Sequence, residues 1–534
     1  MNEFKDPRKI WEKYQAGLNY KQSIALFDTV EENEEFFVGR QWGDLEYTTP
    51  TVDKTTVNFL QRVVSYFVSN ITTDSIGVRC RFFNMPKEQA KGYEDAIKAQ
   101  LDQVIEDNDL NGSSKDIVRD SAVDGDACYH IYFDIDAPSG QAAEGLVKIE
   151  QIPNTDVIFG NVQQTDTEKQ PYIIIASRKT LDEMKALAKK FGAKADEIQP
   201  DSGEYENYLQ SKDSADRVTM LTAYFRKGGS IHRVISTEST IIDRERDMGY
   251  RLYPVAWMPW EKQRGSYHGV SCVTALIPNQ IAINKSYSMA LRQQSLGAYP
   301  KILYDKAMFP DGWSNRIGAA IAVNGDPRGV AMNLTPSADV PNSIFTMINN
   351  LMSHSREMMG ASDASLGNVN PDNTSAIIAV QNATAMPLEM KKRAYQQMIE
   401  KVVRSMLDII SVSYGEREIL ITDELGNERI ELFDWGSLKD VLLKLSVDIG
   451  DANYWDPNTQ ATMLERLLQA QVITDPVMFV DHMPDGLLKD KDRLLAELKE
   501  ARQNAMQQMP GGDAALAAGA AAGGLPLPEM PTGI

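Results

Sequence analysis

The amino-acid sequence predicts an α+β protein made of several domains. Its 534 residues are more than one hydrophobic core usually holds together. Short segments with strand-like apolar patterns recur through the first half, whereas long segments with helical spacing dominate the second half. Between them, two predicted helices flank a short segment rich in strand and turn residues. We therefore expect a mixed N-terminal part, a helix–β–helix middle and a mainly helical C-terminal part.

The N-terminal part is predicted to begin with helices and to continue as a mixed sheet. Residues 6–40 are strongly charged and helical in pattern, and the apolar residues of 57–68 recur at helical spacing. A strand over 77–83 and helices over 87–107 and 114–123 follow. Further elements are then expected as strands at 128–133, 146–152, 156–160, 171–177, 217–226 and 231–236, with one helix at about 180–191.

A helix with very little charge is predicted after this mixed part. Between His268 and Pro300 the charged residues are Lys285 and Arg292, and no acid is present. These two lie seven positions apart and therefore share one face of a helix. Pro278 suits the first turn of a helix, where its missing N–H needs no partner. We place the helix from Pro278 to about residue 296 and expect its basic face to meet either solvent or the lumen of an assembly.

A small β-rich segment and a second helix come next. Residues 301–340 combine short apolar runs with repeated glycines and prolines, which is typical of short strands joined by turns. The following helix, at about 343–359, carries an apolar stripe along one face. If the two helices pack antiparallel, the β-rich segment projects from their far end. The stripe includes Ile344, Met347, Ile348, Leu351 and Met352.

A polar loop separates this second helix from a long one. Gly360 can end the second helix in a left-handed conformation. Residues 361–374 contain serine, asparagine and aspartate but no cation. The helix predicted from residue 375 to about 410 contains Pro387, which removes a backbone hydrogen bond, and we expect a kink there.

The C-terminal part is predicted to contain a few strands and then short helices. Strands are expected at 418–422, 429–433 and 443–449. Two helices then begin with the same device, an aspartate followed by proline at 456–457 and at 475–476. After a last helix at about 489–506, the Ala/Gly/Pro-rich segment 508–534 has no pattern that could bury a face, and we expect it to be disordered.

Composition excludes several classes of function. The net charge of −20 makes the chain a poor candidate for tight binding of duplex DNA, which depends on lysine and arginine at the phosphates. Neither G-x-x-x-x-G-K-[ST] nor G-x-G-x-x-G occurs, so we expect no nucleotide cofactor. The three cysteines indicate no disulfide scaffold. We also expect no signal peptide and no membrane-spanning segment, because no apolar run is long enough.

One pair of residues raises the question of a metal site. Cys128 and His130 lie two positions apart on a predicted strand, so both side chains point to one face. A metal ion needs three or four ligands, and the other histidines are scattered singly along the chain. A metal-dependent hydrolase built on Cys128 and His130 is therefore a remote alternative. We predict no catalytic residues, no metal ligands and no cofactor.

Several motifs resemble the portal proteins of tailed bacteriophages, in the same order along roughly residues 30–505. Phe36-Phe37-Val-Gly39-Arg40-Gln41-Trp42 resembles an aromatic-Gly-Gln-Trp motif of that family, and the helix that starts at Asn58 resembles the one that follows it. The segment from Tyr267-His-Gly269 to Lys285 is similar to the approach to the first stem helix. Leu366-Gly367, the polar loop and the long helix resemble the tunnel loop and the kinked wing helix.

The resemblance implies a division of the chain into the parts of a portal subunit. These parts are a wing at 1–265, a first stem helix at 266–297, a clip at 298–340, a second stem helix at 341–360, a tunnel loop at 361–374, the kinked helix with the rest of the wing at 375–455, a helical crown at 456–507 and a tail at 508–534.

The resemblance also implies a function without catalysis. Portal subunits form a ring, expected here to be a dodecamer, at the capsid vertex through which double-stranded DNA is packaged and ejected. The implied partners are the packaging terminase, the head-tail adaptor, and the major capsid and scaffolding proteins, with DNA in transit bound weakly. The implied location is the virion, after assembly in the host bacterial cytoplasm. A different capsid or connector protein is the alternative.

Within such a ring, two groups of residues gain expected roles. The apolar stripe from Ile344 to Met352 is expected at the subunit interface. Twelve copies at −20 each would carry roughly −240 formal charges, a field that repels phosphates at close range. The residues expected to line the DNA channel are Lys285, Arg292, Asp363, Ser365, Asn368, Asn370, Asp372 and Asn373.

Overall fold

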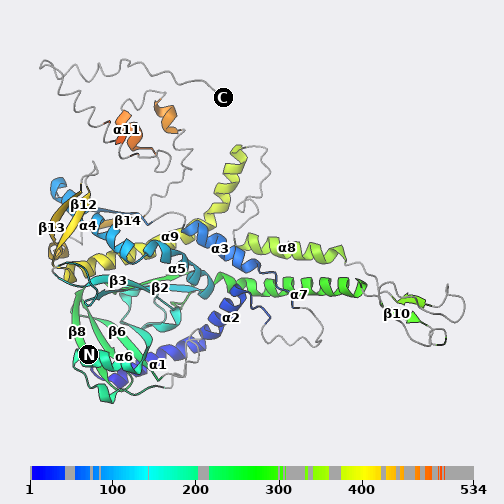
Figure 1. The fold of residues 1–534 in the computed structure, drawn as a ribbon, viewed down its shortest axis with the longest axis horizontal. Helices are drawn as coiled ribbons and strands as arrows, with labels where there is room; N and C mark the ends of the chain where they lie inside the picture. Colours follow the sequence, from blue (N-terminus) through cyan, green and yellow to red (C-terminus); the bar gives the residue numbers. More distant parts are fainter. Residues whose placement is uncertain are drawn as a thin grey trace. The chain divides into compact units, whose positions relative to one another are not determined.

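The computed structural model describes most of the chain up to residue 498. The described residues are 3–42, 54–72, 76–82, 86–141, 143–201, 216–298, 301–304, 307, 331–334, 341–359, 374–422, 428–440, 445–449, 463–468, 476–483, 491, 494, 495 and 498. They combine helices and sheets, as predicted for an α+β protein (Figure 1). The chain forms two compact units, the first comprising Met1–Asn84, Leu101–Glu416 and Asp434–Ile449, and the second Met85–Gln100, Arg417–Phe433 and Gly450–Ile534.

The helices predicted near the N-terminus are confirmed. Asp6 caps the first helix by accepting a hydrogen bond from the backbone N–H of Arg8, at 3.1 Å. Gly39 ends the second helix in a left-handed conformation, with φ of +93°. The helices are α1 (Pro7–Ser23), α2 (Leu26–Val38), α3 (Phe59–Ile71), α4 (Lys87–Asp107) and α5 (Leu110–Asp124).

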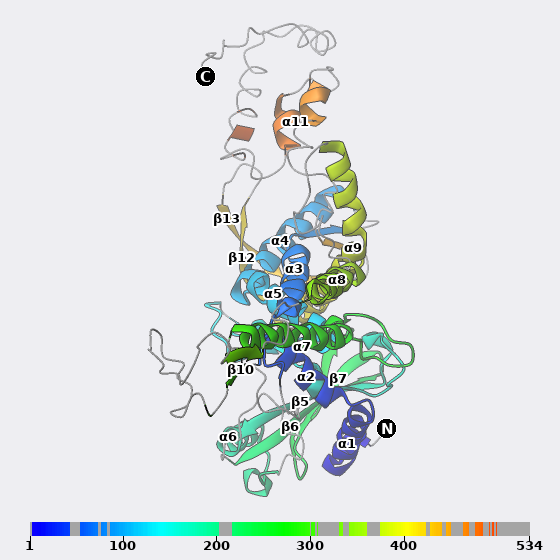
Figure 2. The same cartoon turned by 90° about the vertical axis from the view of Figure 1, so that its right-hand side faces the viewer.

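Two antiparallel sheets form the mixed part of the first unit. The smaller has the strand order β3-β2-β9 and the larger β4-β5-β6-β7-β8. Ile10 of α1 packs on one face of the larger sheet, and Met184 and Ala188 of α6 pack on the other. Figure 2 shows α1 and α6 on either side of β5 and β6. The elements are β2 (Asp126–Asp134), β3 (Leu146–Ile152), β4 (Val157–Phe159), β5 (Tyr172–Thr180), α6 (Leu181–Phe191), β6 (Arg217–Lys227), β7 (Ser230–Ser236), β8 (Ile241–Tyr250) and β9 (Val255–Pro259).

The sequence did not predict β8 and β9. Most of β8 is charged, because Asp243–Asp247 includes two arginines and a glutamate and so lacks an apolar pattern. The strand β9 has the opposite character, because its residues Val255–Met258 are all buried and show no alternation. Each strand is specified by its neighbours in the sheet rather than by its own sequence.

One strand pair joins distant parts of the chain. The predicted strands near residues 80 and 446 are observed as β1 (Val78–Phe82) and β14 (Leu445–Ile449). They pair antiparallel, with Val78 opposite Ile449 and Phe82 opposite Leu445. Local sequence predicts each strand but not their pairing.

The middle of the chain is a helix, a strand pair and a second helix. Helix α7 (Cys272–Ala298) and helix α8 (Asn342–Met358) pack against each other. Strands β10 (Lys301–Tyr304) and β11 (Ala331–Leu334) pair antiparallel between them in the sequence. Residues 308–330 of the predicted β-rich segment lie outside the described residues.

The predicted start of α7 was wrong. The helix begins at Cys272, and Pro278 lies inside it rather than in its first turn. The hydroxyl of Ser271 accepts a hydrogen bond from the N–H of Val273 at 2.9 Å, which is the capping contact of a helix start. Proline is common at helix starts, but here the capping residue is Ser271, seven residues before Pro278, and the helix begins at the next residue, Cys272.

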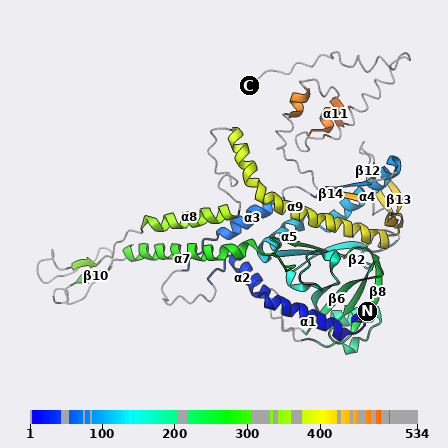
Figure 3. The same ribbon diagram turned by 180° about the vertical axis from the view of Figure 1, so that it is seen from behind.

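Helix α9 (Thr374–Ser413) is the long helix that the sequence predicted. Its C-terminal half is a core helix, with Ile399, Val402, Val403 and Leu407 fully buried. Figure 3 shows that the ribbon of α9 bends between two helical segments. Pro387 lies within the helix, and a kink at this residue stays a prediction.

The second unit contains the predicted strand pair β12 (Glu416–Thr422) and β13 (Glu428–Asp434). Within this unit, the rings of Tyr93 and Phe433 meet edge to face at 5.7 Å. Helix α11 (Pro476–Asp481) begins at its proline, as predicted. The predicted tail 508–534 and most of the last predicted helix lie outside the described residues. Among the residues that are described, no helix is both long and apolar enough to cross a membrane.

Candidate functional site

The candidate site centres on the helix pair α7 and α8. A side-chain hydrogen bond marks where they meet, because Asn279 of α7 donates to the hydroxyl of Ser355 of α8 at 2.9 Å. Ile348 lies seven positions before Ser355 on the same face of α8, and both are buried, with exposed fractions of 5% and 0%. This face of α8 therefore packs within the chain.

The apolar stripe predicted on α8 is divided between two environments. Ile348 is buried on the face toward α7, whereas the Met347 side chain is 47% exposed. Ile344, Leu351 and Met352 are half-buried. Helical spacing alone could not separate a stripe that packs on a helix of the same chain from one that remains available to another chain.

A polar ladder on another face of α7 holds the chain segment that precedes α3. The ladder consists of Gln280, Asn284 and Ser288, which are spaced four residues apart and so share one face. The N–H of Val57 donates to the Asn284 side chain at 3.0 Å, and that of Phe59 donates to Gln280 at 3.3 Å. In return, Gln280 donates to the carbonyl of Val57 at 2.7 Å.

The polar ladder also reaches the motif near residue 40. Asn284 donates to the side chain of Gln41 at 2.7 Å, and Gln41 donates to the carbonyl of Phe36 at 2.7 Å. Trp42 donates from its indole N–H to the hydroxyl of Thr56 at 3.0 Å. The Gly-Arg-Gln-Trp motif therefore helps to fix the rotation of α7 about its own axis. This role was not predicted from the sequence, although amides spaced four apart in an uncharged helix are a usable signal.

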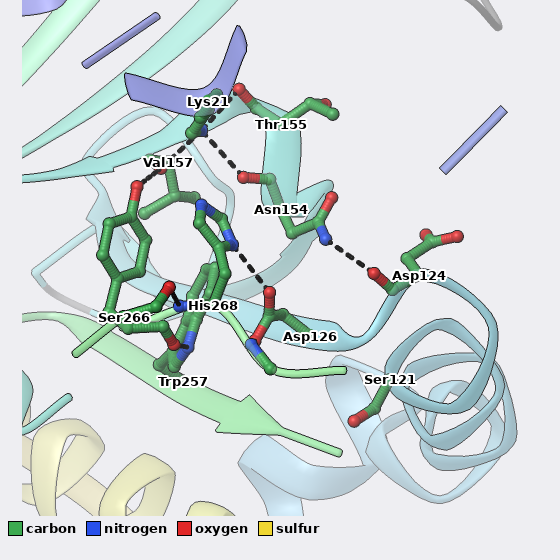
Figure 4. Close-up of polar contacts among 12 residues, drawn as sticks. Lys21, Ser121, Asp124, Asp126, Asn154, Thr155, Val157, Trp257, Ser266 and His268 are labelled. Carbon is green, nitrogen blue, oxygen red and sulfur yellow. Dashed lines mark hydrogen bonds and ion pairs between the residues drawn. The ribbon is translucent and has the colours of Figure 1, made fainter. Parts of the chain in front are cut away.

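A buried polar network fixes the chain just before α7 (Figure 4). His268 makes a hydrogen bond from Nδ1 to the carboxylate of Asp126 at 2.7 Å, and the N–H of Gly269 donates to the other oxygen of that carboxylate at 2.7 Å. Both side chains are almost fully buried. Because Asp126 is the first residue of β2, this contact joins the small sheet to the start of α7.

Two glycines allow this close approach. A Cβ atom on Gly269 would lie 2.6 Å from the carbonyl oxygen of Gly125. A Cβ on Gly125 would lie 2.9 Å from the carbonyl oxygen of Gly269, and the φ of Gly125 is +94°. Neither position can take a side chain without moving backbone. The glycine of the Tyr-His-Gly motif is therefore required by packing.

A buried lysine completes the network from α1. The ammonium group of Lys21 donates to three backbone carbonyls, those of Asn154 at 2.9 Å and of Thr155 and Val157 at 2.7 Å. Burial lowers the pKa of Lys21 to about 7, and the charges of Asp156 and Asp126 oppose that shift. Burial likewise lowers the pKa of His268, against the opposing effect of Asp126. The network was not predicted, because a lysine in a charged helix gives no sign of being buried.

The residues predicted to line a channel are only partly described. Lys285 and Arg292 lie on α7 and are half-buried. On a helical wheel they fall on a different side of α7 from Asn279, which faces α8. The other predicted lining residues, Asp363, Ser365, Asn368, Asn370, Asp372 and Asn373, lie outside the described residues.

Cys128 and His130, the two residues considered as metal ligands, are both buried in the fold. His130 is buried and makes a hydrogen bond through Nε2 to the hydroxyl of Tyr224 at 2.9 Å. Burial lowers the pKa of His130 to about 3, so its ring is neutral at physiological pH. Burial raises the pKa of the Cys128 thiol. Across the described residues, no three His, Cys, Asp or Glu side chains gather as a metal site would require.

The family model of the phage P22-like portal protein matches residues 226–521, which is more than half of the chain and includes α7, α8 and α9. No curated protein matches the chain.

Proposed function

Because the chain belongs to the phage P22-like portal protein family, we propose that it is the subunit of a portal ring at one vertex of a bacteriophage capsid. The observation that carries this proposal is the family match across the helix–β–helix middle and the long helix. In the proposed assembly, double-stranded DNA enters and leaves through the ring. The subunit is a structural component of the virion, and its function requires no cofactor.

The parts of the subunit are assigned as follows in this proposal. Helices α7 and α8 form the stem, and the segment between them, 298–340, forms the clip. The two sheets and their helices belong to the wing, together with α9 and the strands that follow it. Residues 361–374 form the tunnel loop, and 456–507 the crown. The side-by-side packing of α7 and α8, with a strand pair between them in the sequence, supports the stem and clip assignments.

The ring can be tested directly with the purified protein. Negative-stain microscopy should show end-on rings with a central hole, and native mass spectrometry should give one closed number of subunits, expected to be twelve. A protein that stays monomeric at micromolar concentrations in both experiments would contradict the proposal.

The clip is proposed as the docking site of the packaging terminase and later of the head-tail adaptor. Replacing residues 298–340 by a short Gly-Ser linker should leave the wing folded but abolish co-purification with the terminase ATPase. Unchanged co-purification would place the docking site elsewhere on the subunit.

A further inference from the structure

A groove between α3 and α8 is lined by one face of each helix. Its volume is about 190 Å³. On each helix the lining residues follow the spacing i, i+3, i+4, i+7, which defines one face. They are Phe59, Arg62, Val63 and Tyr66 of α3, and Asn349, Met352, Ser353 and Arg356 of α8.

The groove carries positive charge. The Arg62 side chain is exposed and makes no hydrogen bond or ion pair in the described part of the chain. Arg356 donates to the carbonyl of Met352 and to the hydroxyl of Ser353, both at 3.3 Å. None of the eight lining residues is acidic. Two guanidinium groups beside neutral donors form a site that suits carboxylates, because guanidinium N–H groups match the two oxygens of a carboxylate.

Helix α2 carries a complementary acidic stripe. Asp28, Glu31, Glu32 and Glu35 follow the same spacing, and Asp28 and Glu32 are exposed. Across the described residues, Asp28, Glu31 and Glu32 pair with no base, and the Arg40 side chain lies 3.8 Å from Glu35. The stripe therefore faces away from the core of its own chain. The buried side of α2 holds Leu26, Asn33 and Phe36.

We propose that the acidic stripe of α2 in one subunit docks in the arginine groove of the next subunit. The inference rests on the proposed ring and names one interface that closes it. Two grooves would repel each other, and so would two stripes, so attraction arises only when different patches meet. When such a contact repeats head to tail, it forms a closed ring if the rotation from one subunit to the next closes. Figures 1 and 2 show α2 and α8 on opposite sides of α7, as a head-to-tail contact requires.

Charge reversal in the full-length protein tests the contact. The double variant R62E/R356E should need a protein concentration at least roughly tenfold higher to form rings, measured by mass photometry at low salt. The double variant D28R/E32R should show a similar defect. Combining all four substitutions restores opposite charges across the interface and should restore assembly.

A matched control changes the same number of charges elsewhere. Arg244 and Arg264 are exposed, and neither has a partner in the described part of the chain, so R244E/R264E should assemble like the wild type. Circular dichroism must show the wild-type spectrum for every variant compared.

Rings from R62E/R356E at wild-type concentrations would overturn this inference while leaving the proposed ring intact. Failure of the four-fold variant to recover would exclude α2 as the occupant. A wild-type protein without rings would overturn the proposed function as well.

Discussion

At the residue scale, the side chains that decide this fold are polar groups far from any surface. Lys21 has an exposed fraction of 0%, and its three acceptors belong to a segment more than 130 residues away. His268 and Asp126 are similarly distant in sequence and equally buried. Buried polar groups tolerate little change, because losing one partner leaves the others without hydrogen bonds.

Replacing Lys21 with methionine should destabilise the first unit strongly. The thioether fills much of the same volume but donates no hydrogen bond, so the carbonyls of Asn154, Thr155 and Val157 lose their donor. We expect a loss of about 1–3 kcal/mol in the free energy of unfolding, the range for leaving buried acceptors without a donor. Urea denaturation at constant pH measures it. K9M, at an exposed position on the same helix, is the control, and equal stability of the two variants would contradict the prediction.

His130 should make the stability depend on pH. Its pKa is lowered from 6.5 to about 3 in the folded protein, so between these values the unfolded chain binds the proton and the folded chain does not. The free energy of unfolding should therefore fall as pH falls below 6.5, by at most about 1.4 kcal/mol per pH unit from this residue. H130Q cannot take up this proton and should show a shallower decline between pH 6.5 and 5.

The control for this experiment is the exposed His354, whose side chain is 72% accessible. H354Q should follow the wild-type curve. His268 has a lowered pKa too and contributes in the same direction in every variant. An H130Q curve parallel to the wild type would show that His130 takes no part in the pH dependence.

At the element scale, α7 uses its faces for different contacts. One face meets α8 and another carries the polar ladder that holds the segment before α3. Lys285 and Arg292 flank Ser288 of the ladder, on the side away from Asn279. An α-helix with so little charge can serve several neighbours, because amide and hydroxyl side chains satisfy backbone groups without the cost of burying charge.

Adjacent residues of α8 should respond differently to the same change. Met347 is 47% exposed, so M347E should leave the subunit folded but weaken assembly if the proposed stem interface includes it. Ile348 is 5% exposed, so I348E should cost several kcal/mol of unfolding free energy, because it buries a charge without a partner. Thermal unfolding and mass photometry separate the two effects. Intact rings of M347E would remove Met347 from the interface.

At the scale of the whole molecule, the acidic charge has a physical consequence for a channel. A ring of twelve subunits at −20 each would carry about −240 formal charges, which disfavours adhesion of DNA phosphates. The proposed tunnel loop at 361–374 contains Asp363 and Asp372 and no cation. DNA could then pass through such a channel without being held.

Adding cations to the proposed loop should make DNA adhere. The variant D363K/D372K changes the charge by four per subunit, or about 48 around a ring of twelve, and creates phosphate contacts. Ring assembly should be normal, whereas genome packaging should slow or stall, most severely at low salt. D107K/D116K makes the same charge change at two exposed positions in the N-terminal half and serves as the control. Packaging at the normal rate in D363K/D372K at every salt concentration would show that the loop does not touch DNA.

The sequence by itself determined most of the elements and the order in which they occur. Helical spacing located α3 and α8, and alternation located β1, because these patterns depend only on residues close together in the sequence. The motifs carried the portal resemblance, which the family match confirms. Polar and charged segments such as β8 were not predicted as strands, because their conformation is fixed by pairing with another strand.

Only the tertiary structure decided which residues meet. The pairing of Val78 with Ile449, the burial of Lys21 and the two environments of Met347 and Ile348 all depend on segments far away in sequence. The same holds for the ladder that joins Asn284 to Gln41 across 243 positions. A local sequence pattern indicates whether a side chain is suited to burial. Burial itself requires a second surface to pack against, and that surface is brought into contact only when the whole chain folds.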